Sequence, residues 1–444
     1  MLGLSYFQGF CLLFFYRYFR LIVNLWSFWT FKPIPIPDNP TLTNKDVTVI
    51  LPSLDGEGEE LERTIKSILA NEPFELIVVT VDDNLEKAQK TIAKTPAGQQ
   101  GRLRCMSIKQ ANKRRQMARA IPEVKTEIVV FADDDVDWPA KLLQWILAPF
   151  ESKIYGGVVT CQRLRRAENP SFTQRIYGFL GACTSNAATS IVLQHATWMA
   201  EWLDHKFTDG FTTESWFFGR YQLNADDDNF ITRWLVNHKH EVYMQYHPEC
   251  EVKTTLEDNS KFINQCLRWA RSNWRSNCTS LFVERNIWYQ QPWSTYAVQL
   301  TTVTQLAALG DVGLWFLLYK GVADWPEARA HQAYWLLGSW MIFSKFIKLI
   351  THFVRYPVDI MLWPVSVLFG WLHGIIKIYA LLTLNETTWG SRAGADADNK
   401  DRMIRGNRTP FRPEYQYFYE DNNEKIPLRE DMISYETRLS AVAA

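Results

Sequence analysis

Three consecutive carboxylates, Asp133, Asp134 and Asp135, are the sharpest local indication of chemistry in this sequence. They follow an apolar run, and neighbouring like charges repel unless a positive charge neutralises them. Alternate residues of an extended segment point the same way, so Asp133 and Asp135 can converge on one cation while Asp134 points aside. Carboxylate oxygens favour Mg²⁺ or Mn²⁺, which would bridge a nucleotide diphosphate. The alternative is a solvated acidic turn or a helix N-cap.

Two further charged groups precede this cluster. Asp82 and Asp83 end another apolar run, where their carboxylates can accept hydrogen bonds from a base or a ribose; the alternative is an N-cap. Lys113 and Arg114 lie between the two acidic groups and are placed to donate charge-assisted hydrogen bonds to phosphate oxygens. A basic helix face explains these two residues equally well.

A third acidic run, at 226–228, opens a segment with helical periodicity. A hydroxyl that attacks an anomeric carbon must lose its proton, and a carboxylate of this run can serve as the general base. The structural alternative is that carboxylates at a helix N-terminus interact favourably with the helix dipole.

Gln265, Arg268 and Trp269 stand at helical positions i, i+3 and i+4. One face of that helix therefore presents an amide, a cation and a ring together. Arg268 could bind a diphosphate, and Trp269 could bind an acceptor sugar or contribute to the phosphate site. The alternative is that an arginine and a tryptophan on an amphipathic helix mark a membrane interface.

The elements that must position these side chains alternate between strands and helices. The sequence predicts buried strands at 47–51, 76–81, 128–131 and 157–161, and a helix at 57–70. Continuous apolar strands separated by helices imply a mostly parallel sheet with helices on both faces. Ligands of such sheets bind beyond the carboxyl ends of the strands, where the first two acidic groups lie.

Apolar, aromatic-rich segments surround this α/β region. The segment 4–31 carries Arg17 and Arg20 and is either a membrane-crossing anchor, which we favour, or an interfacial helix. Three apolar blocks, each long enough to cross a bilayer, lie at 293–318, 333–353 and 358–384. The predicted organisation is an anchor (1–32), a Pro-rich linker (33–46), a catalytic domain (47–258), an interfacial helix (259–290), transmembrane or interfacial helices (291–384) and a polar tail (385–444).

Composition excludes several classes of protein. Lys plus Arg equals Asp plus Glu at 48 each, so no global charge indicates a nucleic-acid partner. The seven cysteines show no paired spacing, which favours reduced thiols over a zinc site or disulfides. The sequons at Asn277, Asn385 and Asn407 matter only if they face the secretory lumen, and we expect that they do not.

In this order, the motifs resemble the family 2 glycosyltransferases, in particular the membrane hyaluronan, chitin and cellulose synthases. The resemblance covers about 47–277 and includes Ile50-Leu51-Pro52, the acidic pair at 82–83, Asn112-Lys113-Arg114, the cluster at 133–135 and the Gln-x-x-Arg-Trp motif at 265–269. The segment from Asp227 to Thr232 is similar to a hyaluronan-synthase segment. The run Trp389-Gly390-Ser391-Arg392 is similar to an element that closes over the donor in these enzymes.

The resemblance implies an α/β fold of the GT-A type with N- and C-terminal membrane helices. It implies Mn²⁺ or Mg²⁺ on Asp133 and Asp135, and Asp228 as catalytic base with Asp227 before it. The remaining implied residues are donor-binding Asp55, Asp82, Asp83, Lys113, Arg114 and Asp133, and acceptor- or diphosphate-binding Gln265, Arg268, Trp269, Trp389 and Arg392.

The function implied by this resemblance is inverting, processive transfer from a nucleotide sugar, with UDP expected as the nucleotide. The partners would be the growing polysaccharide and the lipid bilayer, without nucleic acid. The enzyme would sit in the plasma membrane as a multi-pass protein with a cytosolic catalytic domain. The alternatives are a single-transfer lipid glycosyltransferase, similar to ceramide glucosyltransferase, and an inactive membrane scaffold.

Three features depart from the family pattern. Ser53, Leu54 and Asp55 replace a small residue, Tyr and Asn, so a ring that would pack beside uracil is missing. Asp226 stands where glycine is common. Three apolar blocks separate two motifs that should face the same side. Either one block is interfacial or re-entrant, or the tail lies outside and the match at 389–392 is accidental. We favour an interfacial block at 333–353, because of Lys345 and Lys348.

Overall fold

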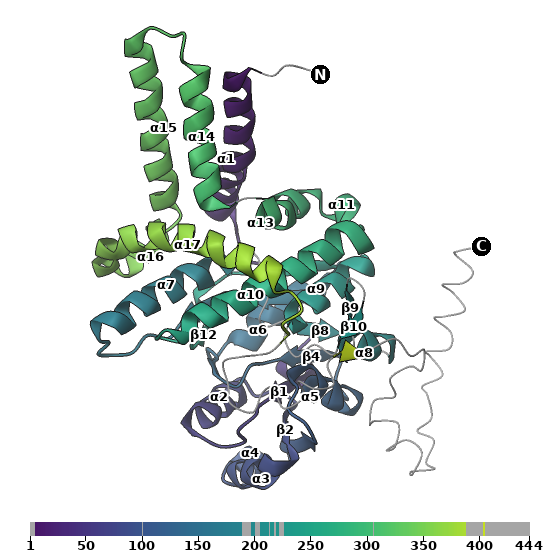
Figure 1. The fold of residues 1–444 in the computed structure, drawn as a ribbon. Helices are drawn as coiled ribbons and strands as arrows, with labels where there is room; N and C mark the ends of the chain where they lie inside the picture. The colour runs from purple at the N-terminus through teal and green to yellow at the C-terminus, as the bar shows by residue number, and fades with distance from the viewer. Residues whose placement is uncertain are drawn as a thin grey trace, which may run out of the picture. The chain divides into compact units, whose positions relative to one another are not determined.

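The computed structural model describes residues 5–99, 101–188, 197–199, 205–212, 214–216, 219–221, 226–304, 306–387 and 403–404 (Figure 1). Among these residues, a sheet of seven strands has the order β11-β6-β8-β4-β1-β2-β3. Its strand pairs are parallel except where β8 lies between β4 and β6. The strands are β1 (Val47–Pro52), β2 (Glu75–Val81), β3 (Leu103–Ile108), β4 (Ile128–Phe131), β6 (Tyr155–Thr160), β8 (Thr197–Met199) and β11 (Glu241–Gln245).

The strands are buried on both faces, as continuous apolar runs predict. Val49 and Leu51 of β1 pack with α2 (Glu59–Leu69) and α6 (Leu142–Leu147), whereas Ile50 packs on the opposite face with α5 (Lys113–Ala120) and α9 (Asp227–Asn237). The period-two alternation of strand side chains divides β1 between these two cores. The predicted α/β fold with a mostly parallel sheet and helices on both faces is therefore confirmed.

Smaller elements complete the α/β region. One small sheet has the order β5-β12-β7, and another has the order β13-β10-β9. Their strands are β5 (Val136–Asp137), β7 (Gln162–Leu164), β9 (Glu214–Trp216), β10 (Gly219–Tyr221), β12 (Val252–Thr254) and β13 (Met403–Ile404). The helices α3 (Leu85–Ala93), α4 (Pro96–Gln99) and α8 (His205–Thr212) also belong to this region.

Two groups of apolar helices extend beyond the α/β region (Figure 1). In the first, α1 (Tyr6–Thr30), α14 (Ala307–Gly321) and α15 (Glu327–Ile347) lie side by side around one apolar cluster. In the second, α10 (Lys261–Cys278) and α7 (Phe172–Ala188) pack with α16 (Ile350–Arg355) and α17 (Trp363–Leu382). Short helices α11 (Ile287–Gln290), α12 (Pro292–Ser294) and α13 (Thr301–Thr304) connect α10 to α14.

The apolar blocks differ from their prediction in continuity. Among the described residues, one helical stretch, Pro357–Leu382, is long and apolar enough to cross a bilayer. Pro292–Thr304 and Ala307–Gly321 meet this criterion together, but they bend by 89° at their junction, so the block at 293–318 is not one straight helix. The interfacial block was expected at 333–353, and this stays a prediction. The helix α15, which covers most of that block, runs alongside α1 and α14, and α17 lies across α10 (Figure 1). The number of crossings stays a prediction.

Candidate active site

The acidic cluster at 133–135 follows β4 at the carboxyl edge of the parallel sheet. Each carboxylate has a different neighbour, because Ser53 Oγ donates to Asp134 Oδ2 at 3.0 Å and Thr255 Oγ1 donates to Asp135 Oδ2 at 2.9 Å. Asp133 Oδ1 lies 2.6 Å from the Lys113 ammonium. All three carboxylates line the main cavity of the protein, so Asp134 does not point away from it as predicted.

Lys113 joins this cluster to the acidic run at the start of α9. Its Nζ also lies 2.9 Å from Asp227 Oδ2, so one ammonium bridges two carboxylates. Burial alone would lower the pKa of Lys113, but Asp133 and Asp227 together raise it above its usual value. Lys113 therefore carries a full positive charge at neutral pH, between a β-strand end and a helix N-terminus.

Asp228 has the properties required of a general base. Burial is the largest cause that raises the pKa of its carboxyl, Asp227 adds to it, and the resulting pKa is about 7. The backbone N–H of Asn229 donates to Asp228 Oδ1 at 2.8 Å, and Asn229 Nδ2 donates to Ser272 Oγ of α10 at 2.9 Å. A general base accepts a proton most effectively when its pKa lies near the pH of the reaction. The carboxylate of Asp228 also lines the cavity.

Asp226 has a backbone conformation that glycine adopts easily. Its φ is 70°, in the left-handed region that residues other than Gly, Asn and Asp rarely adopt. Burial would raise the pKa of its carboxyl, but the guanidinium of Arg275 at 2.9 Å, with Arg114, holds it below the usual value. The ion pair with Arg275 ties the start of α9 to α10.

The predicted role of Arg114 in phosphate binding is wrong. Its side chain is fully buried, donates to the backbone carbonyls of Phe211 at 3.0 Å and Asp226 at 2.6 Å, and lies 3.2 Å from Glu214 Oε2. Glu214 in turn pairs with Arg233 of α9. Because these partners take its charge and hydrogen bonds inside the protein, Arg114 supports the backbone that carries Asp227 and Asp228.

The predicted face of α10 lines the same cavity. Gln265, Arg268 and Trp269 are all among its lining residues. Burial lowers the pKa of Arg268, and the nearby carboxylates, Asp226 foremost, oppose this effect. Gln265 Oε1 is buried and has no hydrogen-bond partner among the described residues. An unsatisfied buried acceptor in a cavity wall can be satisfied by a hydroxyl of a ligand.

Three predicted donor-binding residues lie outside the cavity lining. Asp55, Asp82 and Asp83 are exposed at the ends of β1 and β2, and Asp82 Oδ1 accepts a hydrogen bond from Ser107 at 2.5 Å. Their contact with a nucleotide stays a prediction. Trp389 and Arg392 lie outside the described residues.

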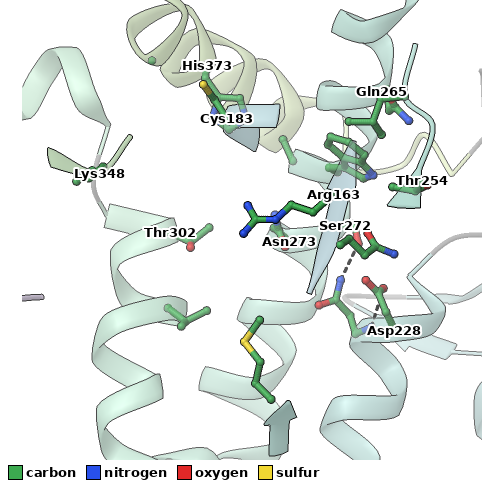
Figure 2. A pocket seen from close by; sticks show the side chains of 18 of the residues that line it. Arg163, Cys183, Asp228, Thr254, Gln265, Ser272, Asn273, Thr302, Lys348 and His373 are labelled. Carbon is green, nitrogen blue, oxygen red and sulfur yellow. Dashed lines mark hydrogen bonds between the residues drawn. The ribbon is translucent and has the colours of Figure 1, made fainter. Parts of the chain in front are cut away.

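The cavity itself is large and continuous. Its volume is about 1350 Å³, and its walls run from the aspartates and α10 to α1, α15 and α17. Figure 2 shows Asp228 and Ser272 on one side of it, Lys348 on another, and Arg163 between them. Local spacing does not predict the contacts of Ser53 and Thr255 with the aspartates, because the partners come from distant segments.

The carboxylates fit a divalent metal that is shared with a ligand. Among the described residues, no group of three or more His, Cys, Asp or Glu side chains could hold a metal alone. Mg²⁺ commonly uses one or two protein carboxylates and takes its remaining ligands from water and substrate phosphates. Asp133 and Asp135, both at the cavity wall, meet that requirement.

The fold, with its cavity beyond the carboxyl ends of the parallel strands, is that of the GT-A glycosyltransferases. The mannosyltransferase PcManGT of Pyrobaculum calidifontis, solved in complex with GDP-Man and Mn²⁺, has a similar fold, with a TM-score of 0.51 over 86% of this chain and 99% of that chain at 14% identity. Residues 44–272 match the family described as Glycosyltransferase like family 2. The chain belongs to glycosyltransferase family 2.

Fungal relatives are similar over most of the chain. A type 2 glycosyltransferase of Zymoseptoria tritici is 46% identical over 98% of this chain and 94% of its own length. A type 2 glycosyltransferase of Pyricularia oryzae is 45% identical over 90% of this chain and 85% of its own length. The NDP-glycosyltransferase ltbB of Aspergillus luteorubrus is 26% identical over 84% of this chain and 93% of its own length.

Proposed function

We propose that this chain is an inverting, metal-dependent, processive glycosyltransferase that uses a UDP-sugar to build and export a cell-surface or cell-wall polysaccharide. The observation that carries the proposal is one cavity that joins the base candidate Asp228, the acidic pair Asp133 and Asp135, and the Gln265–Trp269 face to the apolar helices. Donor, base and acceptor path would then share one continuous space.

On the donor side, Asp133 and Asp135 would hold Mn²⁺ or Mg²⁺. The bound ion would supply positive charge to the diphosphate that leaves. Lys113 and Arg268 are the protein's own cations at this end of the cavity, and they would stabilise the same negative charge as it develops. The structure of PcManGT with GDP-Man and Mn²⁺ is consistent with this chemistry.

On the acceptor side, Asp228 would accept the proton of the attacking hydroxyl. The N–H of Asn229 and the link from Asn229 to Ser272 fix the orientation of its carboxylate. A single in-line displacement, with the base on one side of the anomeric carbon and the diphosphate on the other, inverts its configuration. Gln265 and Trp269 would bind the acceptor sugar through a hydrogen bond and a ring face.

Processivity and export are supported by the size and course of the cavity. Its volume of about 1350 Å³ exceeds the ~300–1,000 Å³ typical of small-molecule sites, which leaves room for several acceptor sugars. It continues to α1, α15 and α17, whose exposed apolar side chains suit a lipid bilayer. We place the enzyme in the plasma membrane with its catalytic domain in the cytosol.

A single transfer to a membrane lipid is the second candidate. It is favoured by the small number of candidate membrane spans among the described residues. One stretch qualifies as a straight span, and one further pair of helices qualifies together but is bent by 89°. A single-transfer enzyme needs no polymer channel, so fewer crossings suffice.

The experiment that separates these functions is a product assay. Purified full-length protein would be incubated with a panel of UDP- and GDP-sugars and Mn²⁺ or Mg²⁺, and products would be sized and digested with linkage-specific hydrolases. A polymer from a UDP-sugar is expected, with no product from Asp228→Asn. A lipid that carries one sugar would contradict processivity, and no transfer from any donor would contradict the enzyme itself.

A further inference from the structure

The end of the cavity away from the aspartates is lined by basic side chains from three parts of the chain. They are Arg17 and Arg20 of α1, Lys345 and Lys348 at the end of α15, and Lys377 of α17. Arg17, Arg20 and Lys345 are electrostatic neighbours of Lys348, and Arg20 is a neighbour of Lys377. We call these five residues the cation cluster. Like charges gathered this closely repel one another unless anions are near.

One carboxylate, Asp311 of α14, lies within this cluster, and its oxygens are occupied. Asp311 Oδ1 accepts a hydrogen bond from Arg17 at 2.7 Å. Asp311 Oδ2 accepts from the Lys345 ammonium at 2.7 Å and from the Trp371 indole N–H at 3.0 Å. This single negative charge contacts two cations of the cluster and also attracts Lys348 from farther away, so it serves more positive charges than it can neutralise.

The remaining three cations have no carboxylate partner among the described residues. Arg20 donates to a backbone carbonyl and to the Thr301 hydroxyl, and Lys377 donates to the carbonyl of Thr302 at 3.3 Å. Lys348 is exposed to the cavity, and no described residue forms a hydrogen bond or an ion pair with its ammonium (Figure 2). Neutral oxygens orient these groups but leave their charge, so the cluster carries a surplus that an anion would neutralise.

The surroundings of the cluster are built to accommodate it. Arg17 lies against Gly310, where a Cβ atom would collide with the guanidinium. Apolar side chains line the same cavity, including Leu25 of α1, Ile347 of α15 and Val367 of α17. A ligand that reaches the cluster through the cavity would therefore carry its negative charge at the end of an apolar body.

We propose that the cation cluster binds the phosphate group of an anionic lipid, whose acyl chains lie along the apolar side chains that line the same cavity. Phosphate presents several acceptor oxygens, which Arg20, Lys348 and Lys377 can contact from three different elements. Basic pockets between membrane helices bind lipid headgroups by the same combination of charge and apolar surface. None of these residues belongs to the donor or base positions, so binding of a lipid to the cluster can be measured without a sugar donor.

The test measures lipid binding without any sugar donor. Full-length protein in neutral detergent would be titrated with phosphatidic acid, with diacylglycerol of the same acyl chains, and with inorganic phosphate, and Kd would be read from tryptophan fluorescence. Phosphatidic acid is expected to bind saturably and diacylglycerol is not. Lys348→Gln is expected to raise the Kd for phosphatidic acid by about tenfold, the scale of one charge-assisted contact.

The matched control is Lys320→Gln, which removes an exposed lysine at the other end of α14 and should leave the Kd unchanged. If Lys348→Gln does not fold, as judged by circular dichroism, Lys377→Gln replaces it with the same expectation. An unchanged Kd in the folded variant, or equal binding of diacylglycerol, would overturn the proposal. Displacement of phosphatidic acid by equimolar inorganic phosphate would assign the site to a free phosphate and also reject the lipid.

Discussion

The two ends of the cavity carry opposite charge, and at each end a single charge lies between two charges of the opposite sign. At one end, the carboxylates of Asp133 and Asp227 share the single ammonium of Lys113. At the other, Arg17 and Lys345 share the single carboxylate of Asp311. In each case one central charge holds two charges of the opposite sign within 3 Å. The comparison teaches that each end gathers mostly charges of the sign opposite to the ligand that we assign to it, a metal ion at one end and a phosphate at the other.

The largest effect is expected from Asp228→Asn. The amide cannot accept the proton, so transfer should fall by roughly 10²–10⁴-fold, the usual contribution of a general base. The variant should also melt at a higher temperature than the wild type, because it removes a buried carboxyl that Asp227 repels. Rates from a donor-turnover assay and melting temperatures would be compared, with Asp137→Asn as a control carboxylate outside the cavity lining. Unchanged turnover would reject Asp228 as the base.

The next largest effect is expected at the centre of the acidic end. Lys113→Gln removes the ammonium between Asp133 and Asp227 and should lower kcat/KM by about 10²-fold, the scale of one charge-stabilising donor. Lys113→Arg should recover part of the activity, because it restores the charge. A Lys113→Gln enzyme with normal kcat/KM would show that the bridge is structural only.

The corresponding substitution at the basic end of the cavity, Asp311→Asn, should lower the free energy of unfolding. It leaves Arg17 and Lys345 without their shared carboxylate, and removal of one partner from a largely buried pair costs about 3 kcal/mol of unfolding free energy. The measurement is chemical denaturation in detergent, with Asp324→Asn as an exposed control beyond α14. Binding of phosphatidic acid should be tighter in Asp311→Asn. Weaker binding would contradict the opposite polarity of the two ends.

The smallest effect is expected from pH. The folded pKa of Asp228 is about 7, above its ordinary value of 3.8, so the carboxylate is protonated as the pH falls below 7. The rate should therefore fall by about tenfold per pH unit below that point, since only the ionised base accepts a proton. The effect of pH on stability has the opposite direction. Because the pKa of this carboxyl is higher in the folded than in the unfolded state, its ionisation lowers the free energy of unfolding as the pH rises from about 4 to 7. A rate that is flat between pH 5 and 8 would contradict this assignment.

Much of the fold followed from local patterns in the sequence. The apolar runs around Ile50, Ile77 and Val130 identified three central strands, because a strand covered on both faces needs no polar alternation. The short antiparallel strand β8 was not predicted, since its three residues carry no periodic signal. The apolar block at 293–318 was read as continuous, but hydropathy does not report the bend within it.

The site could be predicted only where residues act through local spacing. Asp133 and Asp135 reach the cavity because they follow β4, although they lie in a loop and not in a strand, and Gln265 and Arg268 share a face by helix geometry. Arg114 stands beside Lys113 in the sequence, yet it turns into the interior, because its partners Phe211 and Glu214 come from a segment about 100 residues away. Sequence spacing cannot separate a cation that faces a ligand from one that braces the backbone beneath it.

The pairing of Arg17 with Asp311 has a consequence for how the protein assembles during its synthesis. These residues are 294 positions apart, and α1 is made first. At the ~5–20 residues per second of translation, Asp311 is synthesised roughly 15–60 s after Arg17. Arginines without an acidic partner are costly inside a bilayer, so if the protein spans a membrane as we propose, we expect α1 to stay at a polar surface until α14 has been made.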